Sequence, residues 1–228
     1  KLNADYICVL HPLSYLIKKA NFSLLWPLAR RYRLVDAVVV SSSEFSDTSK
    51  TTSFPIVISL YARDQGGMDY HFIENYNFKT KEGRSFHLSS FDSIARYLSK
   101  YPNQNDVHPR DAVAKFWTMR DINALKRSRT FIEETTTNTV YVTRNKLDYY
   151  CYVDVFKKYI QHVPYYFGNC DVMIDDDAFL KIKSAFRYLS LRDHPHIKAG
   201  MPDKADPFLY RRDVDAYFKK LLGEHYVY

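Results

Sequence analysis

The sequence predicts an α/β fold, and two observations lead to this expectation. Three apolar runs of strand length occur early in the chain, at Tyr6–Leu10, Leu34–Val40 and Phe54–Tyr61. A basic stretch with helical spacing of apolar residues separates the first two runs. Residues 65–228 alternate predicted helices and strands, which indicates a mixed α+β region after the first sheet.

The first apolar run shows no alternation and stops at His11-Pro12. This pattern suits a strand that is covered on both faces, as in a parallel sheet. Ile56–Leu60 is also nearly all apolar and predicts an interior strand, with Pro55 at a first position that tolerates proline. Between the first two runs, Pro27 should kink or restart a helix. The stripe of that helix comprises Leu13, Leu16, Ile17, Ala20, Leu24 and Leu28.

Turn residues at Asp64–Gly67 predict a boundary between residues 1–64 and residues 65–228. An acidic residue among Asp175–Asp177 should cap a helix that ends at Leu191. The other elements predicted in the second part are a helix capped by Ser90 and running through Lys100, a helix over Pro109–Lys126, strands over Val140–Val142 and Tyr149–Val155, and a last helix over Arg212–Leu222.

The composition narrows the class of protein. A formal net charge of +7 suits a polyanionic partner, although many basic proteins bind no nucleic acid. No apolar run is long enough to cross a membrane, and no signal peptide is visible, so we expect a cytoplasmic protein. The three cysteines, Cys8, Cys151 and Cys170, lack paired spacing, and they predict buried thiols rather than a disulfide set or a metal site.

Residues 5–64, about a quarter of the chain, carry a family resemblance. The turn His11-Pro12-Leu13-Ser14-Tyr15-Leu16 is followed by a helix containing Phe22–Arg30, a strand, a polar loop with Phe45, and a last strand. This order and spacing resembles the later motifs of the amino-methylating, adenine-specific DNA methyltransferases of restriction–modification systems. The resemblance implies the last three strands of a Rossmann-like methyltransferase sheet, followed by a target-recognition region.

Two motifs of that family do not occur here. One is the Gly-rich turn that approaches S-adenosylmethionine, and the other is the Asp/Asn/Ser-Pro-Pro-Tyr/Phe motif that holds the target amino group. The chain has six glycines, of which only Gly66-Gly67 are adjacent, and no Pro-Pro pair. The family places both motifs before the segment that opens this chain. We therefore expect a C-terminal piece of a longer enzyme, with no catalytic, cofactor-binding or metal-binding residue of its own and no bound S-adenosylmethionine.

The resemblance also implies a strand order. In the family the last strand inserts antiparallel between its two predecessors, which would leave one edge of Tyr6–Leu10 open. We expect the missing N-terminal catalytic half, or a neighbouring chain, to cover this edge.

Phe45 falls at the family position whose ring packs against the flipped-out adenine. An aromatic platform returns part of the stacking energy that a flipped base loses. Without this context, a Phe between Glu44 and Ser46 would be read as an anchor of the loop to the core. Lys50 and Thr51 are candidates for contact with phosphate or with the extruded nucleotide.

Candidate contacts to double-stranded DNA lie mainly within Val107–Thr130, where six basic residues stand against Asp111 and Asp121. Lys and Arg suit phosphates, and Arg and Asn can also read base edges. The solvated face of an amphipathic helix would explain the same pattern. DNA contact is favoured because, in the family that this chain resembles, the target-recognition region follows the last strand of the sheet. A second candidate is the polar turn at 143–146, for which an ordinary hairpin is an equal alternative. The candidates are Arg110, Lys115, Arg120, Asn123, Lys126, Arg127, Arg129, Arg144 and Lys146.

Two other classes of function fit parts of the sequence. A stand-alone DNA-binding specificity subunit without catalysis would explain the basic charge and the missing motifs equally well. A metal-dependent nuclease could use Asp175–Asp177, but acidic residues at a helix start more often cap the helix.

Overall fold

The computed structural model of the chain describes residues 4–45, 53–197, 200–201 and 206–228. It is a mixed α/β structure that divides into two compact units. Unit 1 comprises residues 1–91 and 165–170, and unit 2 comprises residues 92–164 and 171–228. The boundary predicted at residue 64 separates two functional regions rather than two packed units. The units found by packing do not test it, so it stays a prediction. Within the described residues, no helix is long and apolar enough to cross a membrane.

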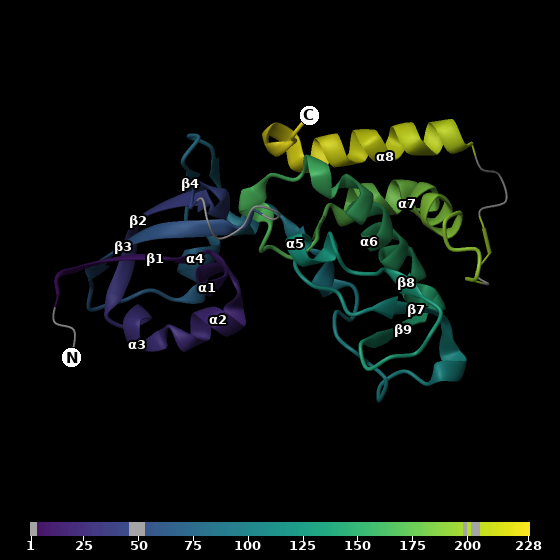
Figure 1. The fold of residues 1–228 in the computed structure, drawn as a ribbon, viewed down its shortest axis with the longest axis horizontal. Coiled ribbons are helices and arrows are strands. Elements are labelled where there is room, and N and C mark those ends of the chain that lie inside the picture. The colour runs from purple at the N-terminus through teal and green to yellow at the C-terminus, as the bar shows by residue number, and fades with distance from the viewer. Residues whose placement is uncertain (1–3, 46–52, 198–199, 202–205) are drawn as a thin grey trace. The chain divides into compact units, whose positions relative to one another are not determined.

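Unit 1 is built on a five-stranded mixed sheet with the order β1-β3-β2-β4-β5 (Figure 1). Short helices α1, α2 and α3 lie on one side of this sheet (Figure 1). The elements are β1 (Tyr6–Pro12), α1 (Ser14–Ile17), α2 (Lys19–Leu24), α3 (Trp26–Ala29), β2 (Tyr32–Ser41), β3 (Pro55–Arg63), α4 (Tyr70–Glu74), β4 (Phe78–Thr80) and β5 (Ser85–Phe86).

The three apolar runs form β1, β2 and β3, as predicted. Strand β3 lies between the other two and is antiparallel to both, so β1 and β2 run parallel to each other. The expected order of these three strands is therefore confirmed. Strand β1 is at the end of the sheet, and it pairs only with β3 among the described residues.

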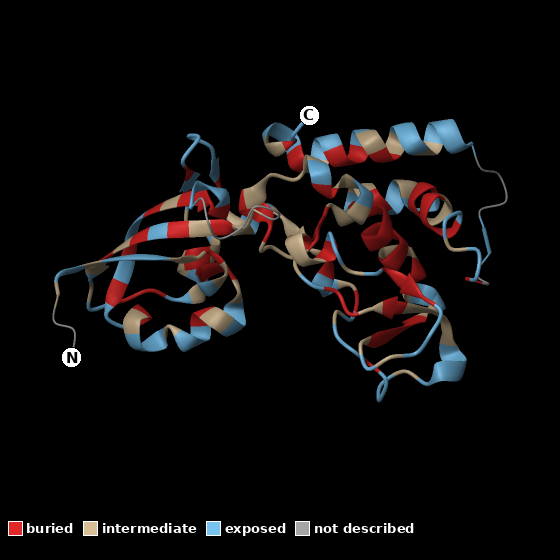
Figure 2. Cartoon of the chain, viewed as in Figure 1, coloured by how far each residue is buried: buried red, intermediate tan, exposed pale blue. Residues whose placement is uncertain are grey.

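The predicted covering of β1 on both faces is wrong. Most of the strand is exposed, including Tyr6 at 67% and Leu10 at 52% (Figure 2). Cys8 is exposed as well, contrary to the expectation of a buried thiol, whereas Cys151 is buried as expected. The run Tyr6–Leu10 lacks alternation because both faces of β1 carry apolar side chains, although most of these side chains are exposed.

The single apolar stripe predicted for the first helical stretch holds only as far as Ile17. Lys18 has extended backbone angles and breaks the helix. The residues after it therefore no longer continue the apolar face of α1. Leu24, expected on the stripe, is 75% exposed, and Phe22 is buried instead. Pro27 lies in the first turn of α3, which agrees with the predicted restart.

Unit 2 combines small sheets with longer helices (Figure 1). A three-stranded sheet has the order β8-β7-β9, and β6 pairs with β10. The elements are β6 (Asp92–Ser93), β7 (Ala112–Trp117), α5 (Ile122–Leu125), β8 (Phe131–Ile132), β9 (Thr139–Thr143), α6 (Leu147–Tyr159), β10 (Met173–Ile174), α7 (Asp176–Leu191) and α8 (Pro207–Leu222).

Three predictions for the region after residue 64 are wrong. The helix predicted from Ser90 through Lys100 is replaced by strand β6 and the 3₁₀ turn Ile94–Arg96. Tyr149–Val155 belongs to helix α6 rather than to a strand, and most residues of this helix are buried. Its tyrosines and valines have β propensity, and a helix buried on nearly every side has no polar face to reveal its period. The single helix predicted over Pro109–Lys126 is also wrong. Ala112–Trp117 is strand β7, which pairs with both β8 and β9, and only Ile122–Leu125 is α-helical.

The last two predicted helices are found. Asp175 caps α7, since its carboxylate accepts a hydrogen bond from the backbone N–H of Ala178 at 3.0 Å. Helix α8 begins five residues before the predicted Arg212, where Asp206 is the N-cap residue.

Candidate nucleic-acid interface

The carboxyl ends of β1 and β2 meet at one edge of the unit 1 sheet, because these two strands are parallel. The backbone N–H of Leu13, just after β1, donates to the Pro55 carbonyl at 3.0 Å. The backbone N–H of Ser42, just after β2, donates to the Phe54 carbonyl at 2.9 Å. Sites in open α/β sheets form at this kind of edge. The sheet therefore places the His11-Pro12 turn and the start of the Phe45 loop along one edge.

Phe45 ends a short 3₁₀ turn, Ser42–Glu44, that follows β2. The turn is anchored, because the buried Ser42 hydroxyl accepts a hydrogen bond from the Phe54 N–H at 3.0 Å. The carboxylate of Glu44 pairs with Lys81. Phe45 itself is 38% exposed, so a firmly held backbone presents an aromatic ring at the sheet edge. Lys50 and Thr51 lie outside the described residues.

His11 occupies the same edge but faces the core. Its Nδ1 donates to the Pro12 carbonyl at 2.9 Å, since that carbonyl can only accept. Nε2 lies 3.2 Å from the Tyr61 hydroxyl and 3.2 Å from the Ser59 hydroxyl. Burial lowers the pKa of His11, although the Pro12 hydrogen bond acts in the opposite direction. A neutral imidazole bonded to two buried hydroxyls suits packing of the strand end, and it leaves no position for proton transfer to a ligand.

The cations of Val107–Thr130 are divided between the two ends of β7 rather than gathered on one helix face. Arg110 precedes Ala112, which pairs with Thr143, so Arg110 and Arg144 lie at the same end of the sheet. The opposite end of β7 leads to α5, and there the chain carries Arg120, Lys126, Arg127 and Arg129. A six-residue strand separates the two groups by about 17 Å at ~3.3 Å per residue.

Most of these cations have no internal counter-charge within the part of the chain that the structure describes. Among the residues that the structure describes, no carboxylate forms an ion pair with the following exposed side chains: Arg110, Arg120, Lys126, Arg127, Arg129 and Arg144. By contrast, Lys115 donates to the Glu133 carbonyl at 2.8 Å. The Lys146 ammonium lies 5.9 Å from the centroid of the Tyr149 ring, and Asn123 is half-buried in α5. The unpaired cations suit phosphate better than Lys115, Lys146 or Asn123 does.

The turn at 143–146 also differs from the predicted hairpin. It is a 3₁₀ turn, Arg144–Lys146, that joins strand β9 to helix α6. Arg144 is exposed at the end of the sheet where Arg110 also lies.

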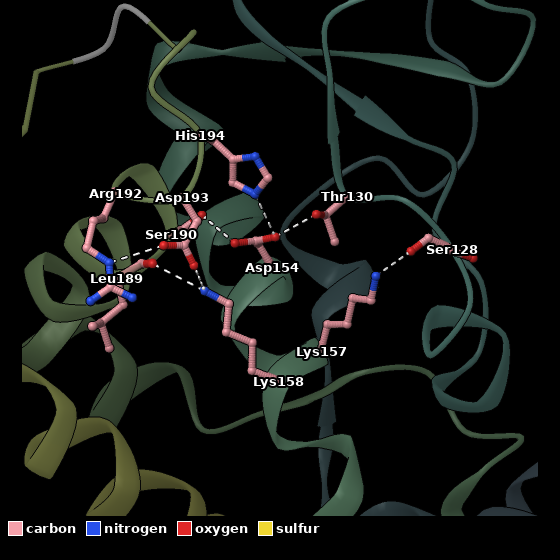
Figure 3. Close-up of polar contacts among 10 residues, drawn as sticks. All are labelled: Ser128, Thr130, Asp154, Lys157, Lys158, Leu189, Ser190, Arg192, Asp193 and His194. Atoms are coloured by element: carbon pink, nitrogen blue, oxygen red, sulfur yellow. Dashed lines mark hydrogen bonds and ion pairs between the residues drawn. The ribbon is translucent and has the colours of Figure 1, made fainter.

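A buried carboxylate that no sequence motif indicated lies close to the α5 end of this surface (Figure 3). Asp154 in α6 is 3% exposed and accepts hydrogen bonds from the Thr130 hydroxyl at 2.6 Å, the Ser190 hydroxyl at 2.8 Å and Nε2 of His194 at 3.1 Å. Burial acts to raise the pKa of Asp154, but the hydrogen bonds from His194, Thr130 and Ser190 outweigh it and hold this pKa below its ordinary value. The one signal that could have found this site is a single aspartate within the apolar run Tyr152–Phe156.

The acidic run at 175–177 is used structurally. Asp175 caps α7, and the carboxylate of Asp176 accepts a hydrogen bond from the Tyr149 hydroxyl at 2.9 Å. Within the described ranges, no group of three or more His, Cys, Asp or Glu side chains is arranged to hold a metal ion.

Comparison with known proteins adds no relative: no family model, no curated protein and no solved structure matches this chain. The geometry of the two units is therefore the basis for assigning a function.

Proposed function

We propose that this chain is the C-terminal part of an adenine-specific DNA methyltransferase of a restriction–modification system. The complete enzyme transfers a methyl group from S-adenosylmethionine to the exocyclic amine of adenine. The chain contributes the last strands of the catalytic sheet, the ring on which the flipped base stacks, and cations that contact DNA phosphates.

The observation that carries the proposal is that strand β1 is apolar and yet exposed. It is apolar along Tyr6–Leu10, exposed over most of its length, and open at its outer edge within the described residues. The open face continues onto β3, where Ile58 pairs with Leu10 and is 39% exposed. A bare apolar edge strand favours pairing with a further strand. The remaining strands of a methyltransferase sheet fit at this edge.

The antiparallel insertion of β3 supports the same proposal. A strand that lies between two parallel neighbours and runs against both is the arrangement expected of the last strand in this family. The motifs of residues 5–64 predict this same order of strands.

The described residues do not fit S-adenosylmethionine. The one adjacent glycine pair, Gly66-Gly67, serves packing, because a Cβ added to Gly67 would lie 2.3 Å from the carbonyl oxygen of Ala29. Gly67 also has a positive φ of 61°, which disfavours other residues. We therefore assign the cofactor, and the chemistry of methyl transfer, to the part of the enzyme that joins β1.

Phe45 is the residue of this chain nearest to the proposed chemistry. Extruding a base from the duplex costs a few kcal/mol, and stacking on an aromatic ring is worth about 1–3 kcal/mol. The fixed backbone before Phe45 allows the ring to receive the base with little loss of conformational freedom. Lys50 and Thr51 are proposed to contact the extruded nucleotide or its phosphate.

The reading frame that encodes the complete protein provides the first test. An in-frame Gly-rich turn and an Asn-Pro-Pro-Tyr type motif upstream of Lys1 are expected. With the complete enzyme, transfer of labelled methyl groups to duplex DNA should fall about five- to 150-fold in Phe45→Ala, the equivalent of one stacked base, while duplex binding changes little. Phe208→Ala removes another exposed ring, 89% exposed on α8, and should leave methyl transfer unchanged.

A stand-alone DNA-binding specificity subunit is the second candidate. The unpaired cations at both ends of β7 favour it as much as they favour the first. Duplex binding together with an upstream frame that lacks both motifs would select this candidate and reject the methyltransferase.

A further inference from the structure

The turn that follows α5 separates its charged side chains from its hydroxyl side chains. Lys126, Arg127 and Arg129 are exposed, whereas Ser128 is half-buried and Thr130 is only 7% exposed. The Ser128 hydroxyl donates to the Ala124 carbonyl at 2.8 Å and so closes the end of α5. The backbone of the turn is therefore held from the inside while three cations point outward.

Helix α6 supplies two further anchors for this turn (Figure 3). The Thr130 hydroxyl donates to one oxygen of the Asp154 carboxylate at 2.6 Å. The Lys157 ammonium donates to the Ser128 carbonyl at 2.7 Å. Asp154 and Lys157 are three residues apart, so they lie on neighbouring positions of one helix face. One face of α6 thus fixes both inward-pointing residues of the turn.

Helix α6 also holds the end of α7, and it does so through the same kinds of contact: a hydroxyl bonded to Asp154 and a lysine bonded to a backbone carbonyl. The Ser190 hydroxyl donates to the other oxygen of Asp154 at 2.8 Å. The Lys158 ammonium donates to the Leu189 carbonyl at 3.3 Å and pairs with the Asp193 carboxylate at 2.6 Å. These contacts hold the end of α7 and do not touch the turn. They provide controls that are matched in chemistry to Thr130 and Lys157.

We propose that Asp154 and Lys157 are positioning residues, which hold the 126–130 turn in the conformation that presents Lys126, Arg127 and Arg129 to the phosphates of duplex DNA. This role rests on the proposed function, because it concerns the same DNA-binding surface. A turn that is ordered before binding loses less conformational freedom when it meets phosphate, and the gain appears as affinity. Neither residue contacts DNA itself.

The first experiment compares Thr130→Val with Ser190→Ala. Each variant deletes one hydroxyl that donates to Asp154, so each should lose a similar amount of thermal stability. Binding to a fluorescently labelled, mixed-sequence DNA duplex should weaken about two- to tenfold in Thr130→Val, as expected for a turn that must be ordered on binding, and should stay unchanged in Ser190→Ala. Thr130→Ser retains the hydroxyl and should restore binding.

The second experiment uses two adjacent lysines. Lys157→Met and Lys158→Met each remove one positive charge, so nonspecific attraction to DNA changes equally in both. Lys157→Met should weaken binding to the same duplex more than Lys158→Met does, because only Lys157 holds the turn. Equal weakening would show that charge alone matters.

Limited digestion with trypsin measures how well the 126–130 turn is ordered in the absence of DNA. Trypsin cleaves after Lys and Arg, so Lys126, Arg127 and Arg129 are themselves cleavage sites. Cleavage after these residues should be faster in Thr130→Val and Lys157→Met, and unchanged in Ser190→Ala and Thr130→Ser. Thr130→Val and Ser190→Ala behaving alike in both binding and cleavage would overturn the positioning role.

Arg127→Ala distinguishes this failure from failure of the proposed function. If Arg127→Ala binds the duplex as well as the unchanged protein does, the surface is not a DNA interface and the positioning role falls with it. If Arg127→Ala weakens binding but Thr130→Val does not, the interface stands and the positioning role alone is rejected.

Discussion

Strand β1 in unit 1 and helix α6 in unit 2 are both rich in apolar residues, yet they have opposite surroundings. Most of β1 is exposed, whereas α6 buries Leu147 and the whole of Tyr150–Phe156. The only charge within that buried run, Asp154, is satisfied by three hydrogen bonds. Unit 2 thus completes a core around its central helix, and unit 1 leaves its outermost strand bare. An exposed apolar segment of this kind indicates a surface that binds a further polypeptide segment.

The largest effect should come from opening the core of unit 2. Phe156→Ala removes a fully buried ring from α6 and should lower the free energy of unfolding by about 3–5 kcal/mol. Leu10→Ala truncates a side chain that is 52% exposed, and it should cost less than about 1 kcal/mol. Urea denaturation of the two variants measures the contrast. Similar losses would mean that β1 is covered in solution.

Asp154→Asn should be the next largest change. The amide cannot accept from all three donors, so the variant should lose about 1–3 kcal/mol of stability near neutral pH. Because the folded-state pKa of Asp154 is lowered, the carboxylate contributes stability that is present above its ordinary pKa of 3.8 and is lost as the pH falls through the lowered value. Thermal unfolding of both proteins from pH 7 downward should therefore show the difference shrinking below about pH 4. A difference independent of pH would reject the ionised carboxylate.

The cations of unit 2 give a smaller effect, which is seen in binding. Arg127→Ala should weaken binding to duplex DNA, and the plot of log affinity against log salt should become shallower by about one. Lys183→Ala serves as the control, because Lys183 is an exposed cation of α7 and is not part of the turn after α5. An unaltered slope in Arg127→Ala would return this turn to a purely structural role.

The smallest effect on stability should accompany a change in association. Leu10→Lys places a charge on the open strand and should alter the free energy of unfolding by no more than about 0.5 kcal/mol. Sedimentation velocity should show less self-association of this variant than of the unchanged chain, since charged residues block edge-to-edge pairing. Leu180→Lys, at a site 44% exposed on α7, should have no such effect. Equal behaviour of the two variants would show that β1 is not an association surface.

Local signals in the sequence determined several features of this protein by themselves. The three apolar runs of the first sheet, Pro27 as a restart of the helix, and Asp175 as the cap of α7 all follow from contacts within a few residues. Strand length, proline geometry and helix capping act locally, so a single sequence reveals them. The antiparallel place of β3 came from a resemblance in the order of motifs rather than from these local signals.

Only the tertiary structure decided the rest. Residues 149–155 form a helix despite their β propensity, because burial on nearly all sides outweighs that weak preference. Ala112–Trp117 forms a strand because β8 and β9 pair with it from farther along the chain. The Asp154 cluster joins residues 24, 36 and 40 positions away, and no local pattern encodes contacts of that range. Burial and long-range pairing depend on the whole chain, and these forces fixed the position of the turn that carries Arg127.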